Sequence, residues 1–219
     1  MKVHHLSSEN SIIHKFVNQL RDSSVQTDAM RFRKNIYRIG EVLAYEISKN
    51  LSFKEVTLQT PLAPYNGQEI EDDVVICSIL RAGLPLHEGL LSFFDDAENT
   101  FISAYRHHTG SENDFEIVVE YLASPSLEGK TVILADPMLA TGQSLVAVKK
   151  ALEKMGTPKQ IHIAAVIGAT EGINFINNHF SEDTHLWIAA VDEKLNEKGY
   201  IVPGLGDAGD LAYGSKLQH

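Results

Sequence analysis

Apolar residues recur at the spacing of an α-helix along the first fifty positions of the chain. Between residues 12 and 20 they share one helical face: Ile12, Ile13, Phe16, Val17 and Leu20. A longer helix is predicted after Thr27-Asp28, because Asp is a preferred N-cap residue. Its apolar stripe consists of Phe32, Ile36, Ile39, Leu43 and Ile47. Two amphipathic helices are therefore expected before residue 50.

From Val74 onward the pattern changes to short apolar runs separated by helical segments. The runs read "VVICSIL", "TFISAY", "EIVVEYL", "TVILAD", "IHIAAVI" and "HLWIAAV". Nearly continuous apolar strands alternating with helices, such as the one predicted from Ser144 to Met155, indicate a parallel sheet covered on both faces. The polar stretch from His107 to Phe115 predicts a loop or hairpin tip.

These patterns predict the α/β class, with a central, mostly parallel sheet flanked by helices. The length of 219 residues fits a single domain. Within it we expect a helical N-terminal arm at 1–50, an α/β core at 51–195, and a C-terminal loop and tail at 196–219.

Composition narrows the classes of function. The formal net charge of −10 disfavours a broad grip on nucleic acid, which requires clustered cations, but allows a local cationic pocket. Cys77 is the single cysteine, so an internal disulfide is excluded, and its apolar surroundings predict a buried thiol. No apolar run approaches the ~18 residues of a membrane span, and the first residues lack a signal-peptide pattern. We therefore expect no membrane partner and a cytoplasmic location.

The segment from Val132 to Ser144, "VILADPMLATGQS", carries the candidate chemistry. An apolar strand leads to Asp136, then to a small-residue loop, and then to a helix. Thr141 and Ser144 supply hydroxyls, and Gly142 allows close approach of the backbone. The helix N-terminus directs unpaired N–H groups to the same place, at the strand edge where α/β sheets bind ligands. This pattern predicts a phosphate site, although it lacks the lysine of a P-loop.

A second glycine pattern, "GLGDAG" from Gly204 to Gly209, matches the dinucleotide fingerprint G-x-G-x-x-G. That fingerprint requires a strand before it, and a helix, a second strand and an acid ~20 residues further on. Only ten residues follow Gly209, and Pro203 interrupts the preceding strand. Binding of NAD through this segment is therefore not expected.

"DPMLATGQS" resembles the phosphoribosyl pyrophosphate (PRPP) motif of type I phosphoribosyltransferases, in the form typical of uracil phosphoribosyltransferases. In that form Asp136-Pro137 stands where most type I members have two acids. Three further segments agree in order and spacing: "ILRAGL" (79–84), "AYR" (104–106) and "GYIVPGLGDAGD" (199–210). The pattern "LRD…T…FR…AYE" from Leu20 to Glu46 also agrees, so the resemblance covers nearly the whole chain.

The resemblance implies the type I fold and a reaction in which uracil and PRPP give UMP and pyrophosphate, as in pyrimidine salvage. It implies that PRPP contacts the following residues: Arg81, Arg106, Asp136, Pro137, Met138, Leu139, Ala140, Thr141, Gly142, Gln143, Ser144 and Asp207. Asp136 would bind the ribose hydroxyls, residues 140–144 the 5-phosphate, and the two arginines the pyrophosphate, which suits the forked guanidinium.

The resemblance also places the base and the metal. Uracil would be read by Ile201 and by the backbone of Gly206, Asp207 and Ala208, with Mg²⁺ held mainly through PRPP and Asp207 as a candidate contact. Backbone N–H and C=O groups can match the donor and acceptors of uracil without side chains. Asp136, Arg81, Arg106 and Asp207 are the residues expected to act on the reacting groups.

Several positions depart from the family pattern. Gln143 replaces a glycine, Pro85 replaces a glycine, His107-His108 replaces acidic residues, and Leu211 stands where a basic residue is common. Adjacent histidines in an extended segment point in opposite directions, so a solvated pair is expected rather than a metal site.

Two other functions remain open from the sequence. One is a pyrimidine-responsive RNA-binding regulator built on the same fold, which the acidic charge argues against. The other is a nucleotide-binding relative without catalysis, which the changes at Gln143 and Pro85 keep open. The helical arm and the family both imply a homodimer or larger homo-oligomer, and GTP is a candidate effector that the sequence does not decide.

Overall fold

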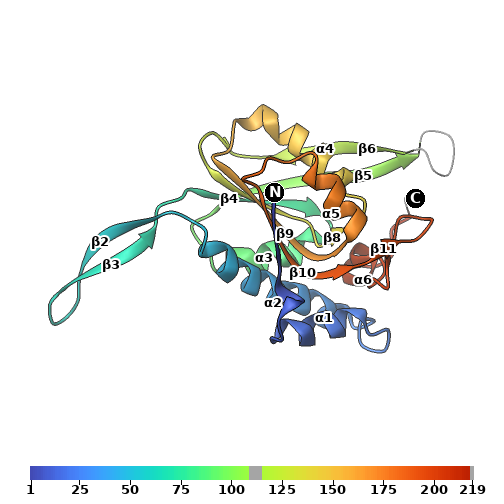
Figure 1. Ribbon diagram of the computed structural model, residues 1–219, viewed down its shortest axis with the longest axis horizontal. Helices are drawn as coiled ribbons and strands as arrows, with labels where there is room; N and C mark the ends of the chain where they lie inside the picture. The colour runs from blue at the N-terminus through green and yellow to red at the C-terminus, as the bar shows by residue number, and fades with distance from the viewer. Residues whose placement is uncertain (109–114, 218–219) are drawn as a thin grey trace.

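The computed structural model describes residues 1–108 and 115–217, and the side chains of residues 1–104 and 118–217. Its centre is one sheet (Figure 1), ordered β1-β10-β9-β7-β4-β5-β6. The strands are β1 (Lys2–His5), β10 (His185–Asp192), β9 (Gln160–Ala169), β7 (Thr131–Ala135), β4 (Val74–Leu80), β5 (Glu98–His108) and β6 (Phe115–Ala123). All neighbours pair in parallel except β5 and β6, which form an antiparallel hairpin. The predicted α/β class with a mostly parallel sheet is confirmed.

Helices cover both faces of this sheet, as the continuous apolar strands predict. One buried cluster joins the sheet to α1 (Ile13–Arg21), α2 (Ala29–Ser48), α3 (Gly83–Leu91) and α6 (Ala208–Tyr213). A second cluster on the other face involves α4 (Gln143–Leu152) and α5 (Thr170–Asn177). Strand β4 shows the alternation directly, because Ile76 points into the first cluster and Cys77 into the second. The thiol of Cys77 is buried, and burial raises its pKa to about 12.

The two N-terminal helices form as the sequence predicts, except that Ile12 precedes α1 and is 58% exposed instead of lying on its buried face. The Asp28 side chain accepts a hydrogen bond from the Arg31 backbone N–H and caps α2. The predicted stripe of α2, from Phe32 to Ile47, is buried against the first face of the sheet. The segment that projects from the body is instead the hairpin of β2 (Phe53–Gln59) and β3 (Pro64–Ile70), as Figure 1 shows.

Short elements complete the chain. The 3-10 turns η1 (Leu6–Ser8) and η2 (Glu153–Met155) follow β1 and α4, and β8 (Met138–Leu139) adds to β9. The two-residue strands β11 (Lys194–Leu195) and β12 (Ile201–Val202) pair with each other just before the glycine-rich loop. Among the described residues, no helix combines the length and the apolar character needed to cross a membrane.

Candidate active site

The candidate site lies at the carboxyl edge of the sheet, where β4 and β7 end side by side. Ser78 of β4 pairs with Ala135 of β7 in the parallel register, so the segments that follow them leave neighbouring strands. Arg81 comes directly after β4, and Asp136 directly after β7. The topology therefore brings together two residues that are far apart in sequence, at the edge where α/β sheets bind ligands.

The segment after β7 reverses direction at Gly142 and enters α4. Gly142 has φ +79° and occupies the N-cap position, and α4 begins at Gln143. A methyl group on Gly142 would lie 2.7 Å from Cγ2 of Ile176 and 3.0 Å from the carbonyl oxygen of Gly172. Both the positive φ and this close approach require glycine. The predicted order of strand, acid, small-residue loop and helix is confirmed.

A small cavity of about 40 Å³ opens at this loop, at the N-terminus of α4. Its lining comprises Asp136, Met138, Leu139, Ala140, Thr141, Gly142, Ser144 and Leu145. The first backbone N–H groups of a helix and its partial positive charge make such a hollow suited to an anion.

Two residues of the predicted motif lie outside the lining of that cavity. Pro137 is buried, and its carbonyl oxygen accepts the N–H groups of Val166 and Ile167, which ties the loop to β9. The side chain of Gln143 is exposed to solvent. The backbone N–H of Gln143 lies in the first turn of α4, within 3.4 Å of Oγ1 of Thr141.

Asp136 is the one acid of the loop. Its Oδ1 accepts the backbone N–H of Met138 at 3.1 Å, which fixes the carboxyl group at the mouth of the cavity. Burial raises the pKa of Asp136 to about 6, although the hydrogen bond from Met138 acts in the opposite direction. The carboxylate therefore predominates above pH 6 and can accept hydrogen bonds from hydroxyl groups.

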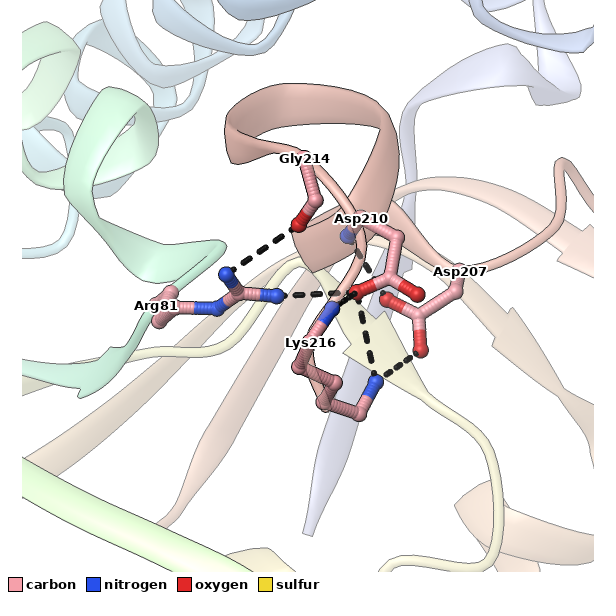
Figure 2. A network of polar contacts seen from close by, with 5 residues as sticks. All are labelled: Arg81, Asp207, Asp210, Gly214 and Lys216. Carbon is pink, nitrogen blue, oxygen red and sulfur yellow. Dashed lines mark hydrogen bonds and ion pairs between the residues drawn. The ribbon is translucent and has the colours of Figure 1, made fainter. Parts of the chain in front are cut away.

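Arg81 faces the C-terminal segment across this edge (Figure 2). Its Nη2 lies 2.8 Å from Oδ1 of Asp210, and its Nη1 donates to the carbonyl oxygen of Gly214 at 3.2 Å. The Arg81 side chain is 40% exposed, so its guanidinium stays accessible from solvent. Arg81 links the edge of the sheet to the segment that carries the predicted base-binding residues.

Asp207 caps the short helix α6 and carries an ion pair. Its Oδ1 accepts the N–H of Asp210 at 3.0 Å, and its Oδ2 lies 2.7 Å from Nζ of Lys216. Burial raises the pKa of Asp207, but the Lys216 ammonium and the backbone hydrogen bonds outweigh it and place the pKa below its ordinary value. Lys216 was not among the predicted site residues, because only folding brings it to Asp207.

The residues expected to read uracil surround the glycine-rich loop. Ile201 and Ala208 are buried, whereas Gly206 is exposed and has φ +91°. Helix α6 begins at Ala208, inside the "GLGDAG" pattern, and no strand follows it in the part of the chain described up to residue 217. This arrangement differs from the strand–glycine loop–helix order that a dinucleotide fingerprint requires.

A buried ion pair holds the start of this loop. Arg21 of α1 donates two hydrogen bonds to the carboxylate of Asp192, at 2.7 and 2.8 Å, and a third to the carbonyl oxygen of Gly204 at 3.0 Å. Asp192 also accepts the Gly204 N–H at 2.8 Å. The "LRD" segment contains Arg21, so the sequence carried a signal for this residue, but not for its partner 171 positions away.

The remaining predicted residues fall in three places. Arg106 lies in β5 opposite Ile117, but its side chain, like those of His107 and His108, stands outside the described residues. Pro85 is buried in the first turn of α3, where proline is tolerated. Leu211 packs against the first core cluster.

Comparison with known proteins identifies close relatives. The family model of uracil phosphoribosyltransferase matches residues 7–215. The chain is 49% identical to a uracil phosphoribosyltransferase of Porphyromonas gingivalis, over 99% of this chain and 100% of that protein. It is 41% identical to one of Thermococcus gammatolerans, over 96% of this chain and 92% of that protein.

Solved structures agree with this result. The AQ2163 protein of Aquifex aeolicus superposes with a TM-score of 0.86 at 32% identity, covering 98% of this chain and 99% of that chain. A hypoxanthine phosphoribosyltransferase of Staphylococcus aureus, at 16% identity and a TM-score of 0.51, covers 85% of this chain and 83% of its own. This second likeness concerns the fold alone.

Proposed function

The chain belongs to the uracil phosphoribosyltransferase family, and from this premise we propose that it transfers the phosphoribosyl group of PRPP to uracil. The products are UMP and pyrophosphate, which makes the chain a pentosyltransferase of pyrimidine salvage. The observation that carries the proposal is the position of Arg81. Arg81 directly follows β4, the strand beside the one that leads to Asp136, and it contacts the segment that carries Asp207. Three motifs far apart in sequence thus share one edge of the sheet.

We assign each part of PRPP to the group whose chemistry suits it. The backbone N–H groups at the start of α4 and the hydroxyls of Thr141 and Ser144 hold the 5-phosphate. The carboxylate of Asp136 accepts hydrogen bonds from the ribose hydroxyls. Arg81 and Arg106 bind the pyrophosphate, because a guanidinium forms forked, charge-assisted bonds with phosphate oxygens.

The base is assigned to the loop that Arg21 and Asp192 fasten. Gly206 to Ala208 would present backbone N–H and C=O groups to the polar edge of uracil, and Ile201 contributes an apolar wall. Cytosine reverses two of the hydrogen-bonding polarities of uracil and would leave buried groups unpaired. Such mismatches are strongly selective.

The protein contributes to this reaction mainly through binding, with little covalent chemistry of its own. Cleavage of the bond between C1 of ribose and pyrophosphate builds positive charge on the sugar ring, as in other glycosyl transfers. The chain aligns the two reactants, and its arginines stabilise the negative charge of the departing pyrophosphate. Asp136 lies nearby and is mainly in its charged carboxylate form above pH 6, since its pKa is about 6.

Magnesium is the proposed cofactor, and the residues present fit an ion carried by the substrate. Mg²⁺ is usually bound through one or two carboxylates together with substrate phosphates. Within the described part of the chain, no cluster of three or more His, Cys, Asp or Glu side chains could hold a metal. Asp207 and Asp210 offer two carboxylates beside Arg81, so they would complete the coordination of such an ion. When bound, the ion would neutralise phosphate charge.

The proposal extends to assembly and surroundings. A homodimer or larger homo-oligomer is supported by the β2–β3 hairpin, because an isolated two-stranded hairpin is marginally stable in water. It exposes Phe53, Leu58, Leu62 and Tyr65. A cytoplasmic location suits an enzyme of nucleotide metabolism with one buried free thiol. GTP stays a candidate effector.

A direct assay tests the proposed function. Purified protein with Mg²⁺, PRPP and labelled uracil should form UMP and pyrophosphate in equal amounts. A protein that binds UMP and forms none would be the non-catalytic relative. RNA binding that is tight at low salt and lost at high salt would support the regulator instead.

A further inference from the structure

Four charged side chains form a compact network at the edge of the candidate site (Figure 2). Two are cations, Arg81 and Lys216, and two are carboxylates, Asp207 and Asp210. Oδ1 of Asp210 is shared, since it lies 2.8 Å from Nη2 of Arg81 and 3.5 Å from Nζ of Lys216. The two cations therefore meet at a single oxygen atom.

The backbone delivers Lys216 to this place. After α6 the chain turns at Gly214, whose φ is +88°, and the Gly214 N–H donates to the carbonyl oxygen of Asp210 at 2.8 Å. The Lys216 N–H then donates to Oδ1 of Asp210 at 3.3 Å. Arg33 of α2 donates to the carbonyl oxygen of Ala212 and so ties α6 to α2. Lys216 is thus positioned by backbone contacts and not only by its ion pair.

The charge state of the network follows from these contacts. Burial lowers the pKa of Lys216, but the carboxylates of Asp207 and Asp210 outweigh it and raise the pKa above its ordinary value. Lys216 is therefore charged at neutral pH, and the four side chains sum to zero. Their exposed fractions range from 31% to 41%, so a ligand from solvent can reach them.

The network lies next to Leu211, where the sequence departs from the family pattern. Leu211 occupies the position on α6 where a basic residue is common, and its side chain packs against the core. Lys216, five residues later and beyond the end of α6, supplies a positive charge to Asp207 and Asp210.

We propose that Lys216 is a pyrophosphate-binding residue, the partner of Arg81 for the diphosphate of PRPP. The inference rests on the proposed function. A diphosphate carries several negative oxygens, and it displaces the single Asp210 carboxylate that now bridges the two cations. Arg81 exchanges Asp210 and the Gly214 carbonyl for phosphate oxygens, and Lys216 turns its ammonium to the same group. The carboxylates of Asp207 and Asp210, released from the two cations, would then be free to hold a metal ion that accompanies PRPP.

The test compares Lys216→Met with Lys154→Met, which removes the same charge from the exposed turn η2, away from the site. Pyrophosphate and UMP are titrated separately by calorimetry in the presence of Mg²⁺. UMP carries the 5-phosphate and the base but no pyrophosphate. We expect Lys216→Met to weaken pyrophosphate binding about tenfold, the scale of one hydrogen bond to a charged group. UMP affinity should stay within about twofold of wild type, and Lys216→Arg should restore pyrophosphate binding.

Three results would overturn the inference. Unchanged pyrophosphate affinity in Lys216→Met would remove Lys216 from the site. Tighter binding would mean that the C-terminal segment competes with pyrophosphate. Equal losses for pyrophosphate and UMP, with a lower melting temperature, would show that Lys216 only holds α6 in place. If wild type forms no UMP from uracil and PRPP, the proposed function fails, but the pyrophosphate titration still decides the role of Lys216.

Discussion

Replacing Arg21 by methionine removes a guanidinium that fastens the glycine-rich loop through three hydrogen bonds. Two go to the carboxylate of Asp192, whose side chain is 6% exposed, and one goes to the carbonyl oxygen of Gly204. Breaking a buried ion pair from one side destabilises a protein by about 3–5 kcal/mol, because the remaining charge stays buried. The Gly204 N–H still reaches Asp192, and Arg21 is 23% exposed, so the lower end of that range applies.

The expected loss of about 3 kcal/mol corresponds to a fall in melting temperature of about 6–12 °C for a chain of this size. Because the loop that follows Gly204 is assigned to uracil, KM for uracil should rise about tenfold, the scale of about 1.4 kcal/mol in binding. KM for PRPP should change much less. Calorimetric melting and steady-state kinetics with each substrate varied in turn measure these two effects.

Two controls isolate the ion pair. Arg31→Met breaks an exposed contact with Asp28 at 3.8 Å, which should alter stability by less than about 1 kcal/mol. The double variant Arg21→Met/Asp192→Asn removes the stranded charge, while the amide oxygen can still accept the Gly204 N–H, so it should recover part of the loss. Melting within about 2 °C of wild type in Arg21→Met, with unchanged KM for uracil, would refute the reasoning.

The ion pair of Arg21 and Asp192 also makes the stability of the fold depend on pH in the acid range. Burial raises the pKa of Asp192, but Arg21 and the Gly204 N–H outweigh it and place the pKa below its ordinary value. Its contribution to stability is therefore present above the unfolded value of 3.8 and is lost as the pH falls through the lower folded value. In Arg21→Met this contribution should be absent, so the difference in stability between the variant and the wild type should shrink as the pH falls through that range.

Three further predictions concern other parts of the molecule. Gly142→Ala should raise KM for PRPP at least about tenfold, because the new methyl group collides with α5; Gly129→Ala, also at positive φ but in open space, should only lower the melting temperature slightly. Burial lowers the pKa of His162 from 6.5 to about 4, so the stability of the protein should fall by roughly 3 kcal/mol as the pH falls from 6.5 toward 4. Urea unfolding, followed by the fluorescence of the single tryptophan Trp187, should show a flatter pH dependence of stability in His162→Gln than in the wild type. Asp207→Ala should lose about 1 kcal/mol of stability as an N-cap and far more activity, whereas wild-type turnover would remove Asp207 from the site.

Local sequence patterns were sufficient to predict most of the helices and strands that form the core. The stripe of α2 and its cap at Asp28 depend on residues a few positions apart, and the structure confirms both. The apolar strands β4, β7, β9 and β10 were equally readable, because burial on both faces leaves a continuous apolar run.

Elements that form only through pairing with distant segments could not be predicted from the sequence. Strand β1 exists because its four residues pair with β10 at the edge of the sheet, across more than 180 positions. The β2–β3 hairpin is exposed on both faces and has no clear apolar alternation. An apolar run such as that of β6 also cannot reveal that its strand runs antiparallel to β5.

The features of the candidate site also divide into those that a local motif predicts and those that depend on folding. The strand, Asp136 and the glycine at the start of α4 were predicted because the motif is contiguous. The contacts of Arg81 with Asp210, of Lys216 with Asp207 and of Arg21 with Asp192 were not, because each joins charges that only folding or a chain reversal brings together.

We propose that this edge of the sheet joins uracil, and no other base, to the phosphoribosyl group of PRPP. A competition assay tests it most directly: equal amounts of uracil, cytosine, hypoxanthine and adenine are incubated with the protein, PRPP and Mg²⁺, and all nucleotide products are resolved. We expect UMP to be the only nucleotide formed, in a yield equal to the amount of pyrophosphate released. A purine nucleotide among the products, or pyrophosphate without UMP, would contradict it.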